Sequence, residues 1–203
     1  YGTTNYIHQF ITEKFPKDIK FNQDNVNVVN FDIEVASDDG FPTPEEAAYP
    51  IISIALKSSK STIYQVWGLD HYDPSKTELD LDGALIQYHH CDSEEDLLAK
   101  FISYWSKNFP DVITGWNTRF FDIPYLVNRI RLLGSEEAVK RLSPWKLVNQ
   151  RNIFKGGREL PGYEIVGVQQ ADYLELFQKF GYSYGAQESY RLDHIAYVVL
   201  GEK

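Results

Sequence analysis

Phe31-Asp32-Ile33-Glu34-Val35 is the stretch that decides the fold of this chain. Side chains alternate between the two faces of a strand, so the two acids point one way and the three apolar residues point the other. The preceding residues 26–30 are rich in valine and are predicted to form a strand that pairs with this one. Two carboxylates aimed at one point repel each other, and a divalent cation with oxygen ligands would offset that repulsion. A solvated strand face is the alternative interpretation of these residues taken alone.

The composition predicts a folded domain, and its net charge by itself favours a partner other than nucleic acid. With 43% hydrophobic and 15% aromatic residues, the 203-residue chain can bury a sizeable core. No apolar run approaches the roughly 18 residues of a membrane span, and no signal peptide opens the sequence. The net charge of −9 argues against tight binding of the phosphates of a nucleic acid, unless metal ions or a local basic patch supply positive charge. The single cysteine, Cys91, fits a reducing compartment.

The ends of the chain predict a piece of a longer protein, since it starts at Tyr1 and contains no methionine. Residues 1–25 are expected to be the tail of a preceding N-terminal region, with a helix over 6–15 that Pro16 stops. Residues 26–203 are expected to form the main domain. Within it, residues 51–56 and 62–67 predict strands that extend the acidic strand into a meander, and 85–88 predict a further short strand.

The tetrapeptide His89-His90-Cys91-Asp92 invites a zinc-site interpretation, but adjacent residues diverge on a strand and no second Cys/His pair completes the ligand set. The start of a helix is the better interpretation, with Asp92 or Ser93 as the cap, because residues 93–96 resemble a capping box.

A third candidate acid, Asp122, stands at a predicted strand-to-helix junction. Residues 111–117 form a short apolar strand that runs into a loop, and Pro124 is tolerated in the first turn of the next helix. Asp122 would then meet the positive end of the helix dipole and face a site. An ordinary helix cap is the alternative. Asp172, which ends a later strand, is either another cap or an acid that supports the same site.

Residues 145–168 predict a protruding β-hairpin, because two β-tending runs flank the turn signal Gly156-Gly157. Its basic side chains make it the best local candidate for phosphate contacts, and an ordinary solvent-exposed hairpin is the alternative. These basic residues are Lys146, Arg151, Lys155 and Arg158. Residues 190–196 predict an amphipathic helix.

Taken together, Asp32-x-Glu34 on a strand and Asn117-x-x-x-Phe121-Asp122 at a junction resemble the proofreading 3′→5′ exonuclease domain of family B DNA polymerases, of the T-even bacteriophage type. Gly40-Phe41-Pro42, the basic hairpin and Asp172-Tyr173-Leu174 fit the same family. The resemblance covers nearly the whole chain. It implies an α/β fold of ribonuclease-H type, in which helices flank a mixed sheet and a β-hairpin protrudes.

The resemblance also implies a site of four acids that bind two divalent ions, Mg²⁺ or Mn²⁺. Asp32, Glu34 and Asp122 match three of these acids as catalytic and metal-binding residues. The family's last motif, Tyr-x-x-x-Asp, has no match: Tyr184 is followed by Glu188 and Tyr190 by Asp193 at the wrong spacing. We therefore expect the fourth acid to lie beyond Lys203 and the 203-residue chain to be weakly active or inactive.

The resemblance implies specific DNA contacts and partners. Phe41 would stack on the terminal bases, Asn117 would orient the strand end, and the hairpin would help to separate it from the template. The other expected DNA-binding residues are Phe121, Arg151 and Lys155. The expected partners are the single-stranded 3′ end, the primer-template and the remainder of the polymerase chain, with no membrane. The expected location is the cytoplasm, that of the infected bacterium if a phage encodes the protein.

Two other functional classes stay open from the sequence. One is a ribonuclease-H-like nuclease that is not attached to a polymerase, and the other is a non-catalytic nucleic-acid-binding scaffold. Paired aspartates of a polymerase active site downstream would exclude the first, and metal titration would separate the second.

Overall fold

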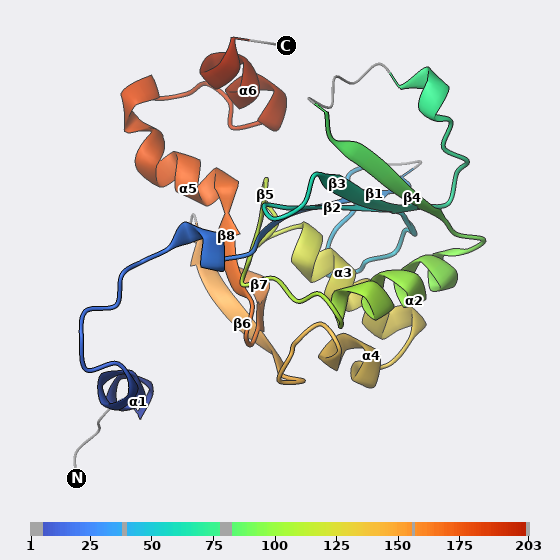
Figure 1. The fold of residues 1–203 in the computed structure, drawn as a ribbon. Coiled ribbons are helices and arrows are strands. Elements are labelled where there is room, and N and C mark those ends of the chain that lie inside the picture. The colour runs from blue at the N-terminus through green and yellow to red at the C-terminus, as the bar shows by residue number, and fades with distance from the viewer. Residues whose placement is uncertain (1–5, 38–39, 78–82, 156, 202–203) are drawn as a thin grey trace.

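The computed structural model describes residues 6–37, 40–77, 83–155 and 157–201, and its main feature is a six-stranded mixed sheet (Figure 1). The sheet order is β4-β3-β2-β1-β5-β8, and a separate antiparallel pair is formed by β6 and β7. The strands are β1 (Val28–Val35), β2 (Ile51–Ser58), β3 (Ile63–Gly68), β4 (Leu85–His90), β5 (Val112–Gly115), β6 (Val148–Lys155), β7 (Arg158–Ile165) and β8 (Gln169–Asp172). The α-helices are α1 (Tyr6–Lys14), α2 (Glu94–Trp105), α3 (Asp122–Leu133), α4 (Glu136–Lys140), α5 (Tyr173–Phe180) and α6 (Leu192–Leu200). Short 3₁₀ turns are η1 (Gln23–Asn25), η2 (Pro74–Lys76) and η3 (Gly181–Tyr184).

Strand β1 lies inside the sheet, antiparallel to β2 and parallel to β5. Val29, Phe31 and Ile33 are buried, whereas Asp32 and Glu34 are exposed, so the predicted alternation is confirmed. The prediction that residues 26–30 and 31–35 form two paired strands is wrong. They form one continuous strand, because β2 and β5 already supply both hydrogen-bonding neighbours of β1.

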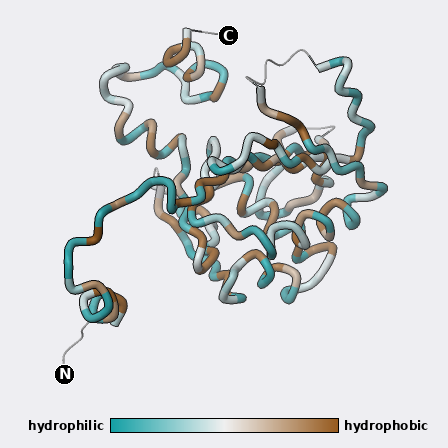
Figure 2. Tube along the Cα trace, in the orientation of Figure 1, coloured by the Kyte–Doolittle hydropathy of each residue, from teal (hydrophilic) through white to brown (hydrophobic). Residues whose placement is uncertain are grey.

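The core lies between the sheet and helices α2, α3 and α4, which cover one of its faces (Figure 1). Phe31 of β1 packs against Phe101 and Trp105 of α2, with ring centroids 6.1 and 6.5 Å apart. Figure 2 shows apolar residues concentrated along these strands and helices. The acids of β1 therefore point to the face opposite α2. The expected architecture of a mixed sheet, flanking helices and a hairpin is confirmed.

The predicted meander holds for β1, β2 and β3, but β4 runs parallel to β3 and extends to His90. His89 stacks on Trp67 with ring centroids 5.1 Å apart, and its Nε2 lies 2.8 Å from Gln65 Oε1. Both contacts give His89 a structural role. Of the two predicted caps, Ser93 is the one that caps α2, since its hydroxyl accepts the Asp96 N–H.

The remaining predicted elements also form. The hairpin of β6 and β7 pairs Val148 with Ile165 at its base and Lys155 with Arg158 at its tip, while Gly156 lies outside the described residues. Helix α1 has no buried residue and stands apart from the sheet (Figures 1 and 2). None of the described helices is long and apolar enough to cross a membrane.

Candidate active site at the end of β1 and α3

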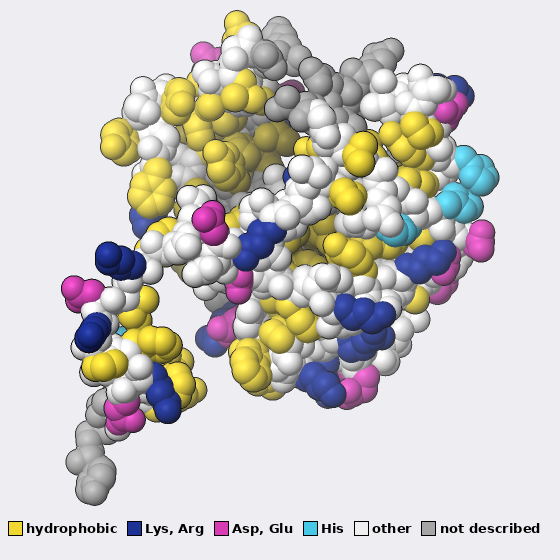
Figure 3. Space-filling view, in the orientation of Figure 1, with side chains coloured by type: hydrophobic (Ala, Val, Ile, Leu, Met, Phe, Trp, Pro, Cys, Tyr) yellow, Lys and Arg dark blue, Asp and Glu magenta, His cyan; other side chains and the backbone are white. Residues whose placement is uncertain are grey.

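Most of the predicted site residues line one open cleft of about 730 Å³. Its floor and one wall contain the predicted residues Asp32, Phe41, Asn117, Phe121 and Asp122. The opposite wall comes from α5, α6 and the segment before α6, and is formed by Leu174, Tyr190, Arg191, Leu192 and Asp193. Figure 3 shows apolar side chains gathered over α5 and α6 at the upper left, where they flank this wall. The tertiary structure thus joins the two sequence motifs.

Asp122 is the first residue of α3 and is only 3% exposed, as the strand-to-helix junction predicted. Its Oδ1 accepts the backbone N–H of Ile33 at 3.2 Å, which places it beside the acids of β1. Burial and then the negative charge of Asp32 raise the pKa of the Asp122 carboxyl to about 8. The folded chain therefore disfavours the ionised form of this carboxyl near neutral pH unless a cation approaches it.

Asp32 and Glu34 stand on the same exposed face of β1. The Asp32 side chain keeps contact with solvent and lines the cleft, and partial burial and then the charge of Glu34 raise the pKa of its carboxyl. Glu34 is not part of the cleft lining. Two residues of strand separate the Cα atoms of these acids by about 6.6 Å. Since Glu34 is exposed, packing does not fix the rotamer that would bring its carboxylate to the others.

The loop between β5 and α3 is held by Asp172, for which the sequence allowed either a cap or a supporting acid. Its carboxylate caps α5 through the N–H groups of Leu174 and Glu175, and it also accepts the N–H groups of Asn117 and Arg119 at 3.2 and 2.9 Å. Asp172 is 3% exposed. Asp172 therefore caps α5 and also holds the loop before α3, because the two oxygens of one carboxylate can accept hydrogen bonds from both segments.

The backbone restricts the residue type at one position in this loop and at one position at the end of β5. Asn117 has φ of +64°, a left-handed conformation that asparagine tolerates better than most residues. A Cβ at Gly115 would lie 2.4 Å from the carbonyl oxygen of Phe31, so only glycine allows β5 to approach β1 this closely. The turn after β5 thereby directs Asn117 into the cleft and the chain toward Asp122.

An aromatic row leads from the cleft mouth into α3. Phe41 is 81% exposed, and its ring centroid lies 5.3 Å from that of Phe121. Phe121 in turn lies 5.6 Å from Tyr125, which is fully buried. The exposed ring is thus supported from behind and presents a free face at the site.

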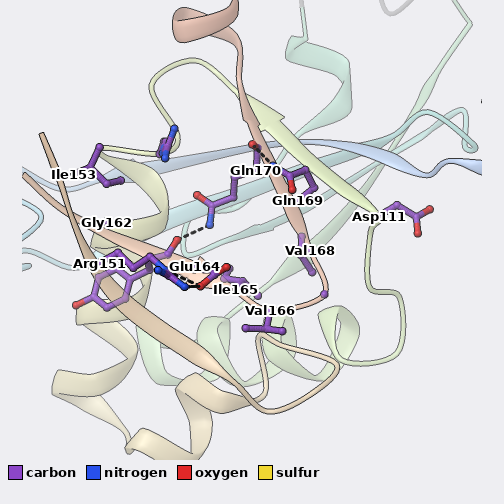
Figure 4. A pocket seen from close by; sticks show the side chains of 13 residues that line it. Asp111, Arg151, Ile153, Gly162, Glu164, Ile165, Val166, Val168, Gln169 and Gln170 are labelled. Atoms are coloured by element: carbon purple, nitrogen blue, oxygen red, sulfur yellow. Dashed lines mark hydrogen bonds and ion pairs between the residues drawn. The ribbon is translucent and has the colours of Figure 1, made fainter. Parts of the chain in front are cut away.

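The hairpin residues lie away from the acids, beside β8. Arg151 lines a polar groove of about 510 Å³ with Glu164, Gln169 and Gln170 (Figure 4). The Arg151 guanidinium is paired with Glu164 across the hairpin, at 2.6 Å between Nη2 and Oε2, so its charge is already partly compensated. The sequence did not anticipate this pairing, which follows from the strand register. The Lys155 side chain lies outside the described part of the structure.

Comparison of the sequence with known protein families identifies the family of this chain. A family described as "DNA polymerase family B, exonuclease domain" matches residues 6–195. The chain belongs to this family.

Its curated relatives are DNA polymerases. The DNA-directed DNA polymerase of Escherichia phage RB69 is 32% identical over 96% of this chain and 23% of its own length. That of Enterobacteria phage T4 is 31% identical over 90% of the chain and 22% of its own length. The DNA polymerase delta catalytic subunit of Candida albicans is 30% identical over 88% of the chain and 17% of its own length. The chain thus spans about a quarter or less of these relatives, and the resemblance to the T-even phage type is confirmed.

Membership in the family B exonuclease domains implies divalent ions, and the donor set can be tested against that implication. Asp32 and Asp122 offer oxygen ligands, and both have raised pKa values that a nearby cation would lower. Within the described residues, however, no three Asp, Glu, His or Cys side chains form a group that could hold a metal ion. Asp32 and Asp122 line the cleft and fit such an ion, whereas Glu34 does not line it, and its role as a third ligand stays a prediction.

The structure also places residues in the cleft of this exonuclease domain that sequence reasoning did not select. Arg191 and Asp193 lie on its rim with 3.5 Å between Nη2 and Oδ2, and both side chains are exposed. Trp116 completes the wall, and its Nε1 donates to the Tyr190 carbonyl at 3.2 Å. Asp193 had a sequence signal in the wrongly spaced pair Tyr190 and Asp193, and Trp116 in its place next to Asn117, but neither signal reveals that the two segments meet.

Proposed function

We propose that this domain removes nucleotides from single-stranded 3′ ends of DNA by metal-dependent hydrolysis, as the proofreading part of a DNA polymerase. The observation that carries the proposal is the pair of acids with raised pKa values, Asp32 and Asp122, in a cleft whose mouth presents an exposed aromatic ring. A scaffold that only binds nucleic acid has no need for a buried carboxyl so costly to ionise.

Asp32, Glu34 and Asp122 would hold two divalent ions, Mg²⁺ or Mn²⁺, together with a fourth acid from outside residues 1–203. Such ions activate water and stabilise the attacking and leaving oxygens at phosphorus. The Ile33 N–H holds the Asp122 carboxylate in place through its 3.2 Å hydrogen bond. Asp172 holds the loop that carries Asn117, so that the side chain of Asn117 can orient the strand end.

The remaining predicted residues would bind DNA. Phe41 would stack on a terminal base, a contact worth about 1–3 kcal/mol that does not depend on base identity. This tolerance suits a site that must accept any frayed base. Phe121 supports Phe41 from behind. Arg151 and Lys155 would contact the backbone near the hairpin, where a phosphate must compete with Glu164 for Arg151.

The partners follow from the relatives, all three of which are named as DNA polymerases or a catalytic subunit of one. We infer that the domain acts on the primer-template together with the remainder of a polymerase chain, in the cytoplasm of an infected bacterium. A nuclease outside a polymerase is the competing possibility, and the match to a polymerase exonuclease family argues against it.

The test is cleavage of a 5′-labelled single-stranded oligonucleotide by the full-length protein with added Mg²⁺ or Mn²⁺. We expect a ladder of products shortened from the 3′ end, and loss of this ladder by orders of magnitude in Asp32→Asn and Asp122→Asn. Asp92→Asn, which changes an acid whose side chain is 93% exposed and which does not line the cleft, serves as the matched control and should keep full activity. Binding of the oligonucleotide without cleavage by the parent protein would support a scaffold instead.

A further inference from the structure

Side chains of helix α3, which begins at Asp122, form hydrogen bonds with the segment C-terminal to Phe41. The Tyr125 hydroxyl donates to the Tyr49 carbonyl at 2.7 Å and accepts the Tyr49 N–H at 3.0 Å. Arg129 Nη1 donates to the carbonyls of Ala47 and Ala48 at 2.9 and 3.1 Å. The loop that carries Phe41 is therefore fixed to the helix that carries Asp122.

Backbone strain in this loop shows how firmly it is fixed. Ala47 has φ of +42° and is fully buried. A residue with a Cβ adopts this left-handed conformation only where its surroundings impose it. Here the guanidinium of Arg129 imposes it, and Arg129 is itself held by a buried ion pair with Glu94 at 2.6 Å.

Asn128 connects this loop to a second element. Its Nδ2 donates to the Pro44 carbonyl at 2.8 Å, three residues after Phe41. Its Oδ1 accepts the Tyr163 hydroxyl at 2.5 Å and Arg131 Nη1 at 3.0 Å. The orientation of the amide is unambiguous, because a carbonyl can only accept and a guanidinium can only donate.

Tyr163 belongs to β7, so the second element is the hairpin. The residue is 5% exposed, its hydroxyl also accepts Arg131 Nη1 at 3.0 Å, and its carbonyl accepts Gln170 Nε2 at 2.6 Å. Gln170 lies in the groove between the hairpin and β8 (Figure 4). The base of the hairpin is thus anchored on both sides, and the half-buried side chain of Asn128 bonds it to the Phe41 loop.

We propose that Asn128 is a positioning residue that couples the β6–β7 hairpin to Phe41. The position of the hairpin on α3 then determines the position at which the Phe41 ring contacts a 3′-terminal base. The role on DNA rests on the proposed function, whereas the link itself exists in the protein without DNA or metal.

Two conservative variants cut the link on opposite sides. Tyr163→Phe removes the hydroxyl on the hairpin side and leaves the Nδ2 donor for Pro44. Asn128→Asp keeps an acceptor for Tyr163 and removes the donor to Pro44. Tyr72→Phe is the matched control, because it removes a hydroxyl bonded to Thr77 in the segment between β3 and β4.

The first measurement is the ¹⁹F resonance of 4-fluorophenylalanine placed at position 41 in the DNA-free, metal-free protein. Its shift reports the ring of Phe121, 5.3 Å away. We expect Tyr163→Phe and Asn128→Asp both to shift or broaden the line, and Tyr72→Phe to leave it unchanged. A line that Tyr163→Phe does not move, or that the control moves equally, would overturn the coupling.

The second measurement is the KM and kcat of the full-length protein on single-stranded DNA. Loss of one hydrogen bond in the link should raise KM roughly 2- to 10-fold with kcat retained. In a Phe41→Ala background, Tyr163→Phe should add nothing further, since the ring that the link positions is gone. Multiplicative effects of the two changes would refute the proposal. Absence of cleavage by the parent protein would instead refute the proposed function, and the ¹⁹F result would then decide the coupling by itself.

Discussion

Asp122→Asn is expected to stabilise the protein in the absence of divalent ions and to abolish cleavage. Burial and the charge of Asp32 raise the pKa of Asp122 from its ordinary 3.8 to about 8. The unfolded chain therefore loses this proton near pH 3.8, whereas the folded chain keeps it until about pH 8. Between these values the folded state binds more protons, so its stability falls as pH rises. The full shift in the pKa of Asp122 corresponds to roughly 6 kcal/mol of folding free energy, and asparagine, which does not titrate, avoids this cost.

The assay is urea denaturation with a chelator at pH 5, 6, 7 and 8. The difference in the free energy of unfolding between Asp122→Asn and the parent protein should grow with pH, by up to about 1.4 kcal/mol per unit. With half that slope, the difference in the free energy of unfolding between the variant and the parent would still be about 2 kcal/mol larger at pH 8 than at pH 5. Saturating Mg²⁺ or Mn²⁺ at pH 8 should raise the stability of the parent protein and have a smaller effect on the variant.

A second buried aspartate provides the comparison. Asp172→Asn removes the oxygen that accepts the Arg119 N–H, and should lower stability by about 1–3 kcal/mol. A stability difference for Asp122→Asn that does not change with pH, or a variant less stable than the parent at pH 8, would refute the assignment of a strained carboxyl.

Four further outcomes are expected. Arg129→Met should lower the free energy of unfolding by about 3–5 kcal/mol, because it leaves Glu94 charged and buried; Glu94→Gln in the same chain should recover part of this in urea denaturation. Phe41→Ala should weaken binding of single-stranded DNA roughly 5- to 150-fold in a fluorescence anisotropy titration, with no dependence on the terminal base. Arg151→Ala should flatten the salt dependence of that binding, and an unchanged slope would leave the hairpin without a phosphate contact there. Residues 1–203 alone should cleave orders of magnitude more slowly than a chain that continues past Lys203, and equal rates would show that the fourth acid lies within them.

The sequence predicted most of the elements because each depends on local rules. The two-residue alternation of β1 places acids on one face whatever its neighbours are. Ser93 and Pro124 mark helix starts through capping chemistry and through the missing N–H of proline. The hairpin followed from its flanking β-tending runs. Strand pairing was harder: β1 has partners on both sides from distant parts of the chain, so its two halves could not pair with each other.

The candidate site shows the same division. The sequence by itself selected the candidate acids, Asn117 and the aromatic residues, because two motifs stand in it at a fixed order and spacing. Only the tertiary structure decided that Asp122 bonds the backbone of Ile33, 89 residues away, and that Asp172 holds the loop between them. The pairing of Arg151 with Glu164 required the hairpin register. Contacts of this kind depend on strand order and side-chain packing. Packing buries the Asp122 carboxyl and places it near the charge of Asp32, and these two effects raise its pKa, so the raised pKa is a property of the fold.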